Sequence, residues 1–384
     1  MLGTRLRQAR LAAGLSLAGL AGKLEHPISK QALSKYEKGL AQPTPTRISD
    51  IAQALNVTAS SLFTEDAIEI EWVAYRKHAS LSKARQSQLI AAAQQRLEVE
   101  FKLRSLFHLD DRHDLPGPIE VRDVRDCENA AAALRMRWNL GDRPIDSLLG
   151  LVEERGGSVV GWQQEWGFDA RSGWAGRSPL LLLNTAVPPD RLRFNAAHEL
   201  GHLVMESTGD GKTDEQFAHR FAAALLVPAE AARRELGTHR RGLDLHELGL
   251  LKQRWGLSMQ AWIRRAHDLE IIGADLYRSL NIQFRSQGWH RTEPYHYESS
   301  ETPALFRRLV LRALAENMIT HEDAEGYLPG MAQRRGAGRE SRASLRDLAR
   351  QSLEERHQAL QQVGVAVDPS ETQAWDEIPS DEIE

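Results

Sequence analysis

Apolar residues recur at helical spacing along most of the chain, and short apolar runs interrupt this pattern in the middle. At the N-terminus the periodic segments are short and separated by tight turns, which is typical of a helix-turn-helix bundle. Ser16 is placed to cap one of these segments and Gly39 to end another. The pattern predicts helices over residues 2–13, 16–24, 28–38 and 48–55, and a fifth short one from residue 60.

Further along, long periodic segments alternate with short apolar runs. Residues 72–78 and 82–107 have helical patterning, and the second segment carries an apolar stripe that suits core or dimer contacts. The runs 157–162 and 179–184 are bounded by turn residues, as strands are. Helical patterning returns near residue 193 and continues, with breaks, through the C-terminal third.

One helical segment carries the residues His198-Glu199-Leu200-Gly201-His202, an H-E-x-x-H motif. Two histidines four apart lie on one face of a helix, so both imidazoles can reach the same ion. Zn²⁺ binds neutral imidazole readily, and a catalytic zinc keeps one coordination position open for water. Glu199 can reach that water as a general base. The apolar neighbours favour burial, and Gly201 inside the helix indicates the close approach of another element.

The helix that follows offers the third protein ligand. Thr213 and Gln216 have the spacing of a capping box, so we expect a helix to begin there. Glu215 lies on the small-residue side of this helix and is our candidate ligand. Asp214 and His219 are rival ligands, and Glu215 could instead complement the helix N-terminus. Mn²⁺ accepts the same ligand types as Zn²⁺.

These residues resemble the ImmA/IrrE family of zinc metallopeptidases over roughly residues 120–295. The resemblance rests on Leu180–Asn184, on Arg193-Phe194, on the A-H-E-L-G-H core and on E-x-x-A-x-x-F-A-x-x-L-L-x-P from Glu215 to Pro228. It implies a gluzincin-like metallopeptidase in which His198, His202 and Glu215 bind zinc and Glu199 is the catalytic base.

The N-terminal segment resembles a second family. The patterns R-x-x-x-G-L-S, I-S-K-Q-A-L-S-K-Y-E-K-G and I-A-x-A-L-N-V look like the XRE (Cro/C1-type) DNA-binding domain over residues 2–63. Residues 1–63 hold eight basic and three acidic side chains, a local net charge of +5 in a chain of net charge −4, and duplex phosphates require such a surface. A helix-turn-helix used only for protein contacts is the alternative. The third helix would contact double-stranded DNA through Ser29, Lys30, Gln31, Ser34, Lys35 and Lys38.

A protein substrate is expected to bind at the sheet. In zincins, an edge strand above the active helix pairs with the extended substrate, and we expect the strand at 179–184 to do so through backbone addition. The predicted substrate-binding residues are Leu181, Leu182 and Leu183.

Composition limits the compartment and the partners. The single cysteine, Cys127, excludes an internal disulfide and fits a reducing cytosol. No apolar run approaches the roughly 18 residues that a membrane span needs, and the N-terminus does not have the pattern of a signal peptide. We therefore expect a cytoplasmic, nucleoid-associated protein with no membrane partner. A homodimer is a further expectation, because helix-turn-helix proteins often bind DNA as dimers.

The predicted fold class is mainly α (α+β), with a five-helix helix-turn-helix domain, a zincin-like domain with a small sheet and a helical C-terminal region. The expected segments are a DNA-binding domain at 1–66, a helical connector at 67–117, a metallopeptidase domain at 118–298 and a C-terminal region with an acidic disordered tail at 299–384.

Two functional hypotheses follow from this organisation. The first is a DNA-binding zinc endopeptidase that cleaves a partner repressor in a stress or mobile-element response. The second is a transcription regulator, or antitoxin-like module, that uses the metallopeptidase fold for sensing or protein binding without turnover. The complete H-E-x-x-H motif with Glu215 favours the enzyme, because a structural zinc normally has four protein ligands.

Overall fold

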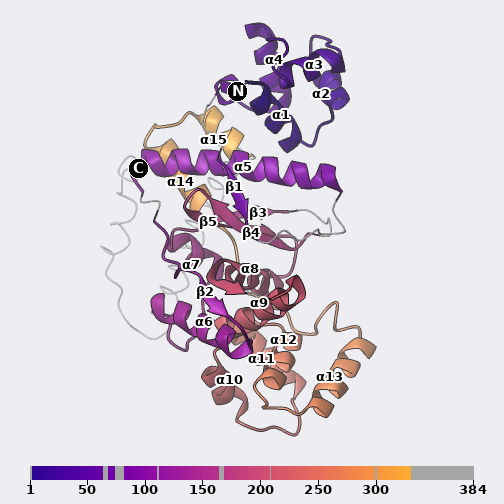
Figure 1. Ribbon diagram of the computed structural model, residues 1–384, viewed down its shortest axis with the longest axis vertical. Helices are drawn as coiled ribbons and strands as arrows, with labels where there is room; N and C mark the ends of the chain where they lie inside the picture. Colours follow the sequence, from indigo (N-terminus) through magenta and orange to yellow (C-terminus); the bar gives the residue numbers. More distant parts are fainter. Residues whose placement is uncertain are drawn as a thin grey trace, which may run out of the picture. The chain divides into compact units, whose positions relative to one another are not determined.

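The computed structural model describes residues 2–63, 68–73, 82–109, 112–163, 168–207, 209–298 and 301–329. The chain divides into two compact units, Met1–Ile319 and Thr320–Glu384. The second unit is described over 320–329, where a capping box between Thr320 and Asp323 opens helix α15 (His321–Tyr327). The predicted acidic tail at 371–384 lies outside the described residues. The predicted mainly helical fold with a small sheet is confirmed (Figure 1).

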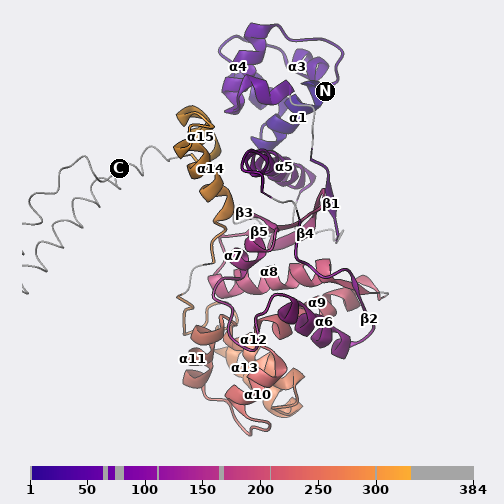
Figure 2. The same cartoon turned by 90° about the vertical axis from the view of Figure 1, so that its left-hand side faces the viewer.

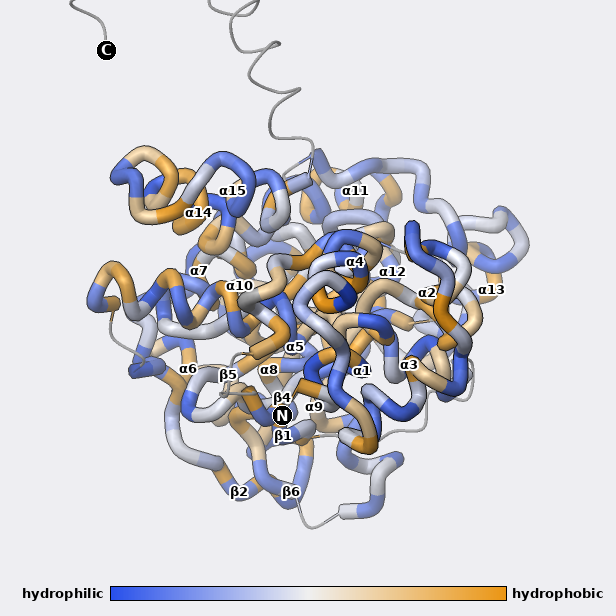
Figure 3. The backbone as a smooth tube through the Cα atoms, turned by 90° about the horizontal axis from the view of Figure 1, so that it is seen from above, coloured by the Kyte–Doolittle hydropathy of each residue, from blue (hydrophilic) through white to orange (hydrophobic). Residues whose placement is uncertain are grey.

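The N-terminal helices match the predicted bundle closely. Ser16 caps the second helix, accepting a hydrogen bond from the Gly19 N–H at 2.9 Å, and Gly39 ends the third with a φ of +70°. Hydrophilic and hydrophobic stretches alternate along these helices, whose apolar sides enclose a core of Leu6, Leu20, Leu24, Leu33, Ile51 and Leu55 (Figure 3). The elements are α1 (Leu2–Ala12), α2 (Leu17–Lys23), α3 (Lys30–Glu37), α4 (Pro45–Leu55) and the 3-10 helix η1 (Ala59–Phe63).

Helix α4 begins three residues earlier than the apolar pattern predicts. Thr44 caps it by accepting from the Arg47 N–H, and Pro45 occupies the first turn, where a missing N–H costs nothing. The predicted fifth helix is a 3-10 helix rather than an α-helix. These local differences leave the arrangement of the helix-turn-helix unchanged.

A four-stranded sheet lies between two helical layers in the order β1-β4-β5-β3 (Figures 1 and 2). Long helix α5 (Lys83–Leu106) covers one face, and α8 (Pro189–Val204) covers the other. Strand β5 pairs with β3 in parallel and with β4 in antiparallel orientation. The strands are β1 (Ile70–Trp72), β3 (Ser158–Trp162), β4 (Ala170–Ala175) and β5 (Ser178–Asn184).

The leucine run of β5 follows from burial on both faces of the sheet. Leu180 and Leu182 pack toward α5, whereas Leu181 and Leu183 pack toward α8, and all four are fully buried. Side chains alternate along a strand, so an all-apolar strand is expected where helices cover both faces.

Two strands of this four-stranded sheet were not predicted. Trp72 belongs to β1, so the predicted helix at 72–78 is wrong at its first residue, and residues 74–78 lie outside the described residues. Strand β4 contains the sequence Ala170–Ala175, whose glycine and arginine weaken the apolar signal of a strand. Both segments are strands because they pair with a neighbour rather than because of their own apolar content.

Helix α8 packs directly against α9 (Gly211–Leu226). A second, two-stranded parallel sheet joins β2 (Ile119–Val121) to β6 (Met205–Ser207), the strand that follows α8. The other helices are α6 (Val124–Arg137), α7 (Leu148–Glu154), α10 (Ala229–Leu236), α11 (Leu245–Trp255), α12 (Met259–Asp268), α13 (Ala274–Ser286) and α14 (Leu305–Ala315).

Candidate metal centre

Helix α8 carries the H-E-x-x-H residues along the face that meets the sheet and α9. His198 and Glu199 are buried and His202 is half-buried, in a helix whose other buried positions are mostly apolar. The predicted close approach at Gly201 is confirmed, because a Cβ built there would lie 3.0 Å from the Phe221 ring of α9. Glycine at this position therefore lets the two helices approach closely.

Helix α9 begins earlier than the predicted capping box. Asp210, not Thr213, is the N-cap, and its carboxylate accepts hydrogen bonds from the Thr213 N–H at 2.8 Å and hydroxyl at 2.7 Å. An aspartate is as good an N-cap as a threonine, and here it lies one turn upstream. Glu215 is therefore in the second turn of α9, where α9 packs against α8.

The structure brings His198, His202 and Glu215 together. The Nε2 atoms of the two histidines are 3.1 Å apart, and each lies 3.3 Å from a different Glu215 carboxylate oxygen. One ligand atom from each residue lies within 4.8 Å of the others, which is the arrangement of a metal-binding group.

These spacings fit a tetrahedral ion. Three ligands about 2.0–2.1 Å from a zinc ion in tetrahedral geometry lie about 3.3 Å from one another. The 3.1 Å between the two nitrogens, and the 3.3 Å from each nitrogen to its own carboxylate oxygen, are close to that value, and two nitrogens with one carboxylate are a donor set that zinc accepts. Three protein ligands leave a fourth position open, as catalytic zinc sites do.

The electrostatics of Glu215 also suit a ligand. Burial alone would raise the pKa of its carboxyl group, but hydrogen bonds and charge from His198 and His202 outweigh burial and hold the pKa well below its usual range. The carboxylate is therefore ionised at neutral pH, as a metal ligand must be.

The rival ligands are placed differently. The His219 ring centroid lies 4.5 Å from that of His198 and 5.7 Å from that of Phe194, yet His219 is not part of the group of converging ligand atoms. Burial lowers the pKa of His219 to about 4, so its ring is neutral at physiological pH. Asp214, the other rival, is likewise outside this group.

Glu199 is held by a residue that the sequence prediction did not assign. The Ser172 hydroxyl, on β4, donates to Glu199 Oε2 at 2.6 Å, and Ser172 is fully buried while Glu199 is 7% exposed. The hydrogen bond fixes one carboxylate oxygen and leaves the other for a proton. No local pattern in the sequence around Ser172 assigned a role to this serine.

A buried ion pair fixes α8 one turn before the histidines. The Arg193 guanidinium donates to the Glu301 carboxylate at 2.6 Å, and neither side chain is exposed. Glu301 also accepts the N–H groups of Leu148 and Leu149, in the first turn of α7. The segment just after residue 300 therefore holds α8 to α7 and belongs to the structural support of the site.

The predicted substrate-binding role of Leu181, Leu182 and Leu183 is wrong. Strand β5 is an inner strand, since β3 and β4 use its two edges. The three side chains are fully buried, so neither the backbone nor the side chains of β5 can receive a peptide. The prediction failed because the upstream strand β4, which separates β5 from the sheet edge, was not recognised.

The predicted DNA-contacting residues lie on or beside α3. Ser29, Lys30, Gln31, Lys35 and Lys38 are exposed, whereas Ser34 is half-buried. The Ser29 hydroxyl caps α3 by accepting from the Ala32 N–H, so it has a structural role in addition to any contact with DNA. The buried Leu33 fixes this helix on the bundle while the polar residues point outward.

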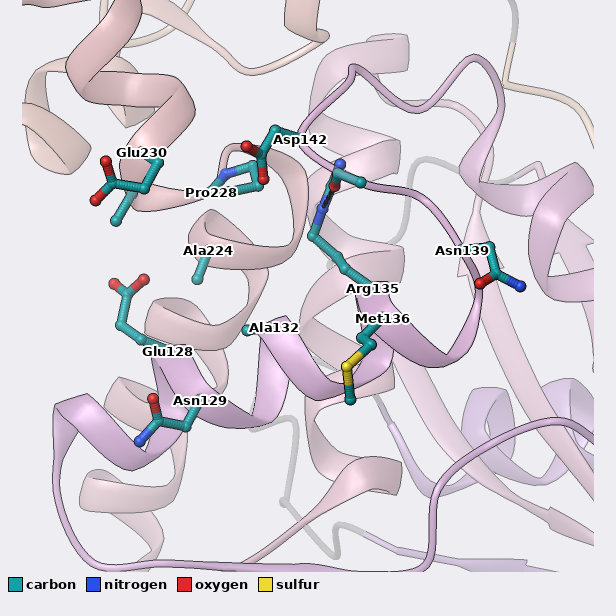
Figure 4. A pocket seen from close by; sticks show the side chains of 12 residues that line it. Glu128, Asn129, Ala132, Arg135, Met136, Asn139, Asp142, Ala224, Pro228 and Glu230 are labelled. Carbon is teal, nitrogen blue, oxygen red and sulfur yellow. Dashed lines mark hydrogen bonds between the residues drawn. The ribbon is translucent and has the colours of Figure 1, made fainter.

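A cavity of about 670 Å³ lies apart from these residues, between α6 and the end of α9 (Figure 4). Its charged groups already have partners: Glu128 pairs with Arg265, Asp142 with Arg234 and Glu230 with Arg233. None of His198, Glu199, His202 or Glu215 lines it. The cavity is therefore separate from the candidate metal centre.

The two histidines and the glutamate of the H-E-x-x-H motif lie beneath the small sheet, beside Glu215. Residues 158–267 match the family described as the IrrE N-terminal-like domain, Peptidase_M78, and residues 6–62 match the helix-turn-helix family. A helix-turn-helix DNA-binding domain thus precedes a metallopeptidase-like domain, and both resemblances seen in the sequence are confirmed. A comparison with curated proteins gave no match. Among the described residues, every helix is too short or too polar to cross a bilayer.

Proposed function

We propose that the chain is a DNA-binding metallopeptidase that hydrolyses a peptide bond in a repressor protein. The observation that carries the proposal is the convergence of His198, His202 and Glu215 beside Glu199, at separations that suit one tetrahedral ion. We assign the three converging residues as metal ligands. A zinc ion held by them would polarise the scissile carbonyl and lower the pKa of water.

The chain's own residues would supply the proton transfers. Glu199 would accept a proton from the attacking water and deliver it to the leaving amine. The Ser172 hydroxyl donates to one Glu199 oxygen and so fixes the direction of the other. Closely packed α8 and α9 hold the ligands in place, and their burial excludes bulk water from most sides.

The helix-turn-helix domain would place the peptidase near its substrate. The exposed polar residues of α3 suit the major groove of double-stranded DNA. A peptidase bound to the same DNA as a repressor meets it at a raised effective concentration, without tight contacts between the two proteins. Substrate choice then depends partly on where both proteins bind.

The test compares the wild-type protein with Glu199→Gln. Both are assayed for metal content and for cleavage of a DNA-binding repressor encoded beside this gene. We expect equal metal content and a loss of cleavage of about 10²–10⁴-fold in the variant, which is the range for removing a general base. Bound metal without cleavage of any neighbouring repressor by the wild-type protein would contradict the proposal and favour a non-catalytic regulator.

A further inference from the structure

Strand β4 is the part of the sheet that lies against the catalytic residue. Its Ser172 donates to Glu199, and β4 as a whole packs on α8. The stretch that matches the peptidase family begins at residue 158 and contributes β3, β5 and β4 to this sheet. Without β1, these three strands would leave β4 as an open edge beside the candidate metal centre.

An open edge of this kind is a template for an extended peptide. Its unpaired N–H and C=O groups bind another strand through main-chain hydrogen bonds, with little dependence on side chains. A peptide that pairs with β4 would have its backbone beside Ser172 and Glu199. The edge of β4, rather than β5, is thus the surface of the sheet that fits a substrate.

The chain itself occupies this edge. Strand β1 comes from residues 70–72, which lie far before the family match, and pairs with β4 in antiparallel register. Trp72 faces Gly173, and the next residue, Val73, donates its N–H to the Ser172 carbonyl at 3.2 Å. The C-terminal end of β1 therefore reaches the position on β4 that is nearest to Glu199.

The attachment of β1 is short and one-sided. Ile70 and Trp72 are only partly buried against the apolar cluster on the α5 face, and the Trp72 ring stacks near the Arg171 guanidinium, 4.3 Å from ring centre to carbon. Glu71 is exposed. A three-residue strand with two half-buried anchors is held far less firmly than the fully buried β5.

We propose that β1 is an internal occupant of the substrate edge of β4, which an extended peptide substrate running antiparallel to β4 must replace. The proposal rests on the proposed peptidase function, because it identifies where the substrate of that site binds. Substrate affinity is then reduced by the fraction of molecules in which β1 has left β4. Loosening β1 raises the affinity for extended peptides, and fixing it lowers that affinity.

The first experiment loosens β1 with the double substitution Ile70→Ser and Trp72→Ser. The probe is a fluorescent synthetic peptide with the sequence of residues 68–73, Ile-Glu-Ile-Glu-Trp-Val, and its binding is measured by anisotropy. We expect about tenfold tighter binding to the variant than to the wild-type protein, as for an edge that is open in about a tenth of wild-type molecules. Leu250→Ser, which replaces an exposed leucine of α11, is the matched control and should bind like the wild type.

The second experiment fixes β1 instead, and it does not depend on a loosened fold. Ile70 and Ala175 face each other in the register, where Cα atoms of an antiparallel pair are about 4.5–5.5 Å apart, within the range of a disulfide. Ile70→Cys with Ala175→Cys should lose at least about tenfold in peptide affinity and in hydrolysis of an unfolded protein when oxidised, and regain both when reduced. Each single cysteine variant should be insensitive to the oxidant.

The outcomes separate this proposal from the peptidase function. Equal peptide binding by the wild-type and loosened proteins, or by the oxidised and reduced double-cysteine protein, would contradict the proposal that β1 occupies the substrate edge of β4. Peptide binding does not require hydrolysis, so it can be measured in the Glu199→Gln background as well. Tighter binding to the loosened variant without any turnover would support the occupied edge while contradicting the peptidase function.

Discussion

The metallopeptidase-like region and the helix-turn-helix region place their functional groups in opposite ways. In the first, His198, His202 and Glu215 come from two helices and converge in a mostly buried space. In the second, Lys30, Gln31 and their neighbours lie along one helix, and most point away from the protein. The first group would hold a metal ion inside the fold, whereas the second group would make its contacts only when the protein is bound to DNA.

This difference determines how each region responds to substitution. Converging buried groups depend on one another and on the packing around them, so a single change affects geometry, metal affinity and stability together. Exposed groups on α3 act nearly independently, and their loss leaves the fold intact. Four predictions test this contrast, from the largest expected effect to the smallest.

Removing the buried cation at Arg193 should have the largest effect on stability. Arg193→Met leaves the Glu301 carboxylate buried without its ion-pair partner, which typically costs about 3–5 kcal/mol. Urea denaturation should show this loss in the free energy of unfolding. Adding Glu301→Gln to the same protein should recover much of it. A loss below about 1 kcal/mol would mean that the α8 anchor is unimportant.

Removing Glu215 should mainly affect metal binding. Substituting a residue that only hydrogen-bonds to a metal ligand typically lowers metal affinity about 10–100-fold. Glu215 is proposed as a ligand itself, so Glu215→Ala should lower metal affinity at least about 100-fold. Competition with a chromophoric chelator measures this, with the exposed neighbour Gln216→Ala as control. Retained affinity in Glu215→Ala together with a loss in His219→Ala would instead identify His219 as the third ligand.

Removing the Ser172 hydroxyl should affect turnover but not metal content. Ser172→Ala frees the Glu199 carboxylate to rotate, and we expect about a tenfold lower kcat with little change in KM. Ser178→Ala removes another hydroxyl from the same sheet, one that donates to the Gly156 carbonyl, and should leave kcat unchanged. A rise in KM together with a fall in metal content in Ser172→Ala would point to a structural role alone.

Removing a single charge from α3 should have the smallest effect. Lys35→Ala should weaken DNA binding a few-fold and reduce the slope of log affinity against log salt by about one, as the loss of one phosphate contact does. Lys83→Ala, an exposed lysine at the start of α5, is the control. A change in the free energy of unfolding or in peptide hydrolysis in Lys35→Ala would show that α3 is not independent of the rest of the protein.

The sequence predicted best where local rules decide the structure. Ser16, Gly39 and the spacing of apolar residues determined the helix-turn-helix elements, because caps and turns depend on near neighbours. The i, i+4 spacing of His198 and His202 likewise placed both rings on one helix face. Glu215 could be proposed because it lies on the small-residue side of a helix that had to approach α8 closely.

The errors arose where pairing between distant segments decides the structure. Strand β1 is a strand only because β4 lies beside it, nearly a hundred residues later in the chain. Because β4 and β1 were not recognised in the sequence, the leucine run of β5 was predicted to form the sheet edge. The substrate was therefore assigned to what is an inner strand. The role of Ser172 depends on the same pairing, since no local pattern links a strand serine to a helix glutamate 27 residues away.

Helix α5 contacts both regions. Leu89, Ala93 and Leu97 pack on the sheet, while α1 packs on the same helix and Arg5 forms an ion pair with Glu98. A cut at residue 66 would separate α5 from α1, and a cut at residue 117 would separate α5 from the strands β3, β4 and β5. The second cut would uncover Leu89, Ala93 and Leu97, and exposed apolar area of this kind invites aggregation, so the behaviour of such a fragment would say little about how the intact protein works.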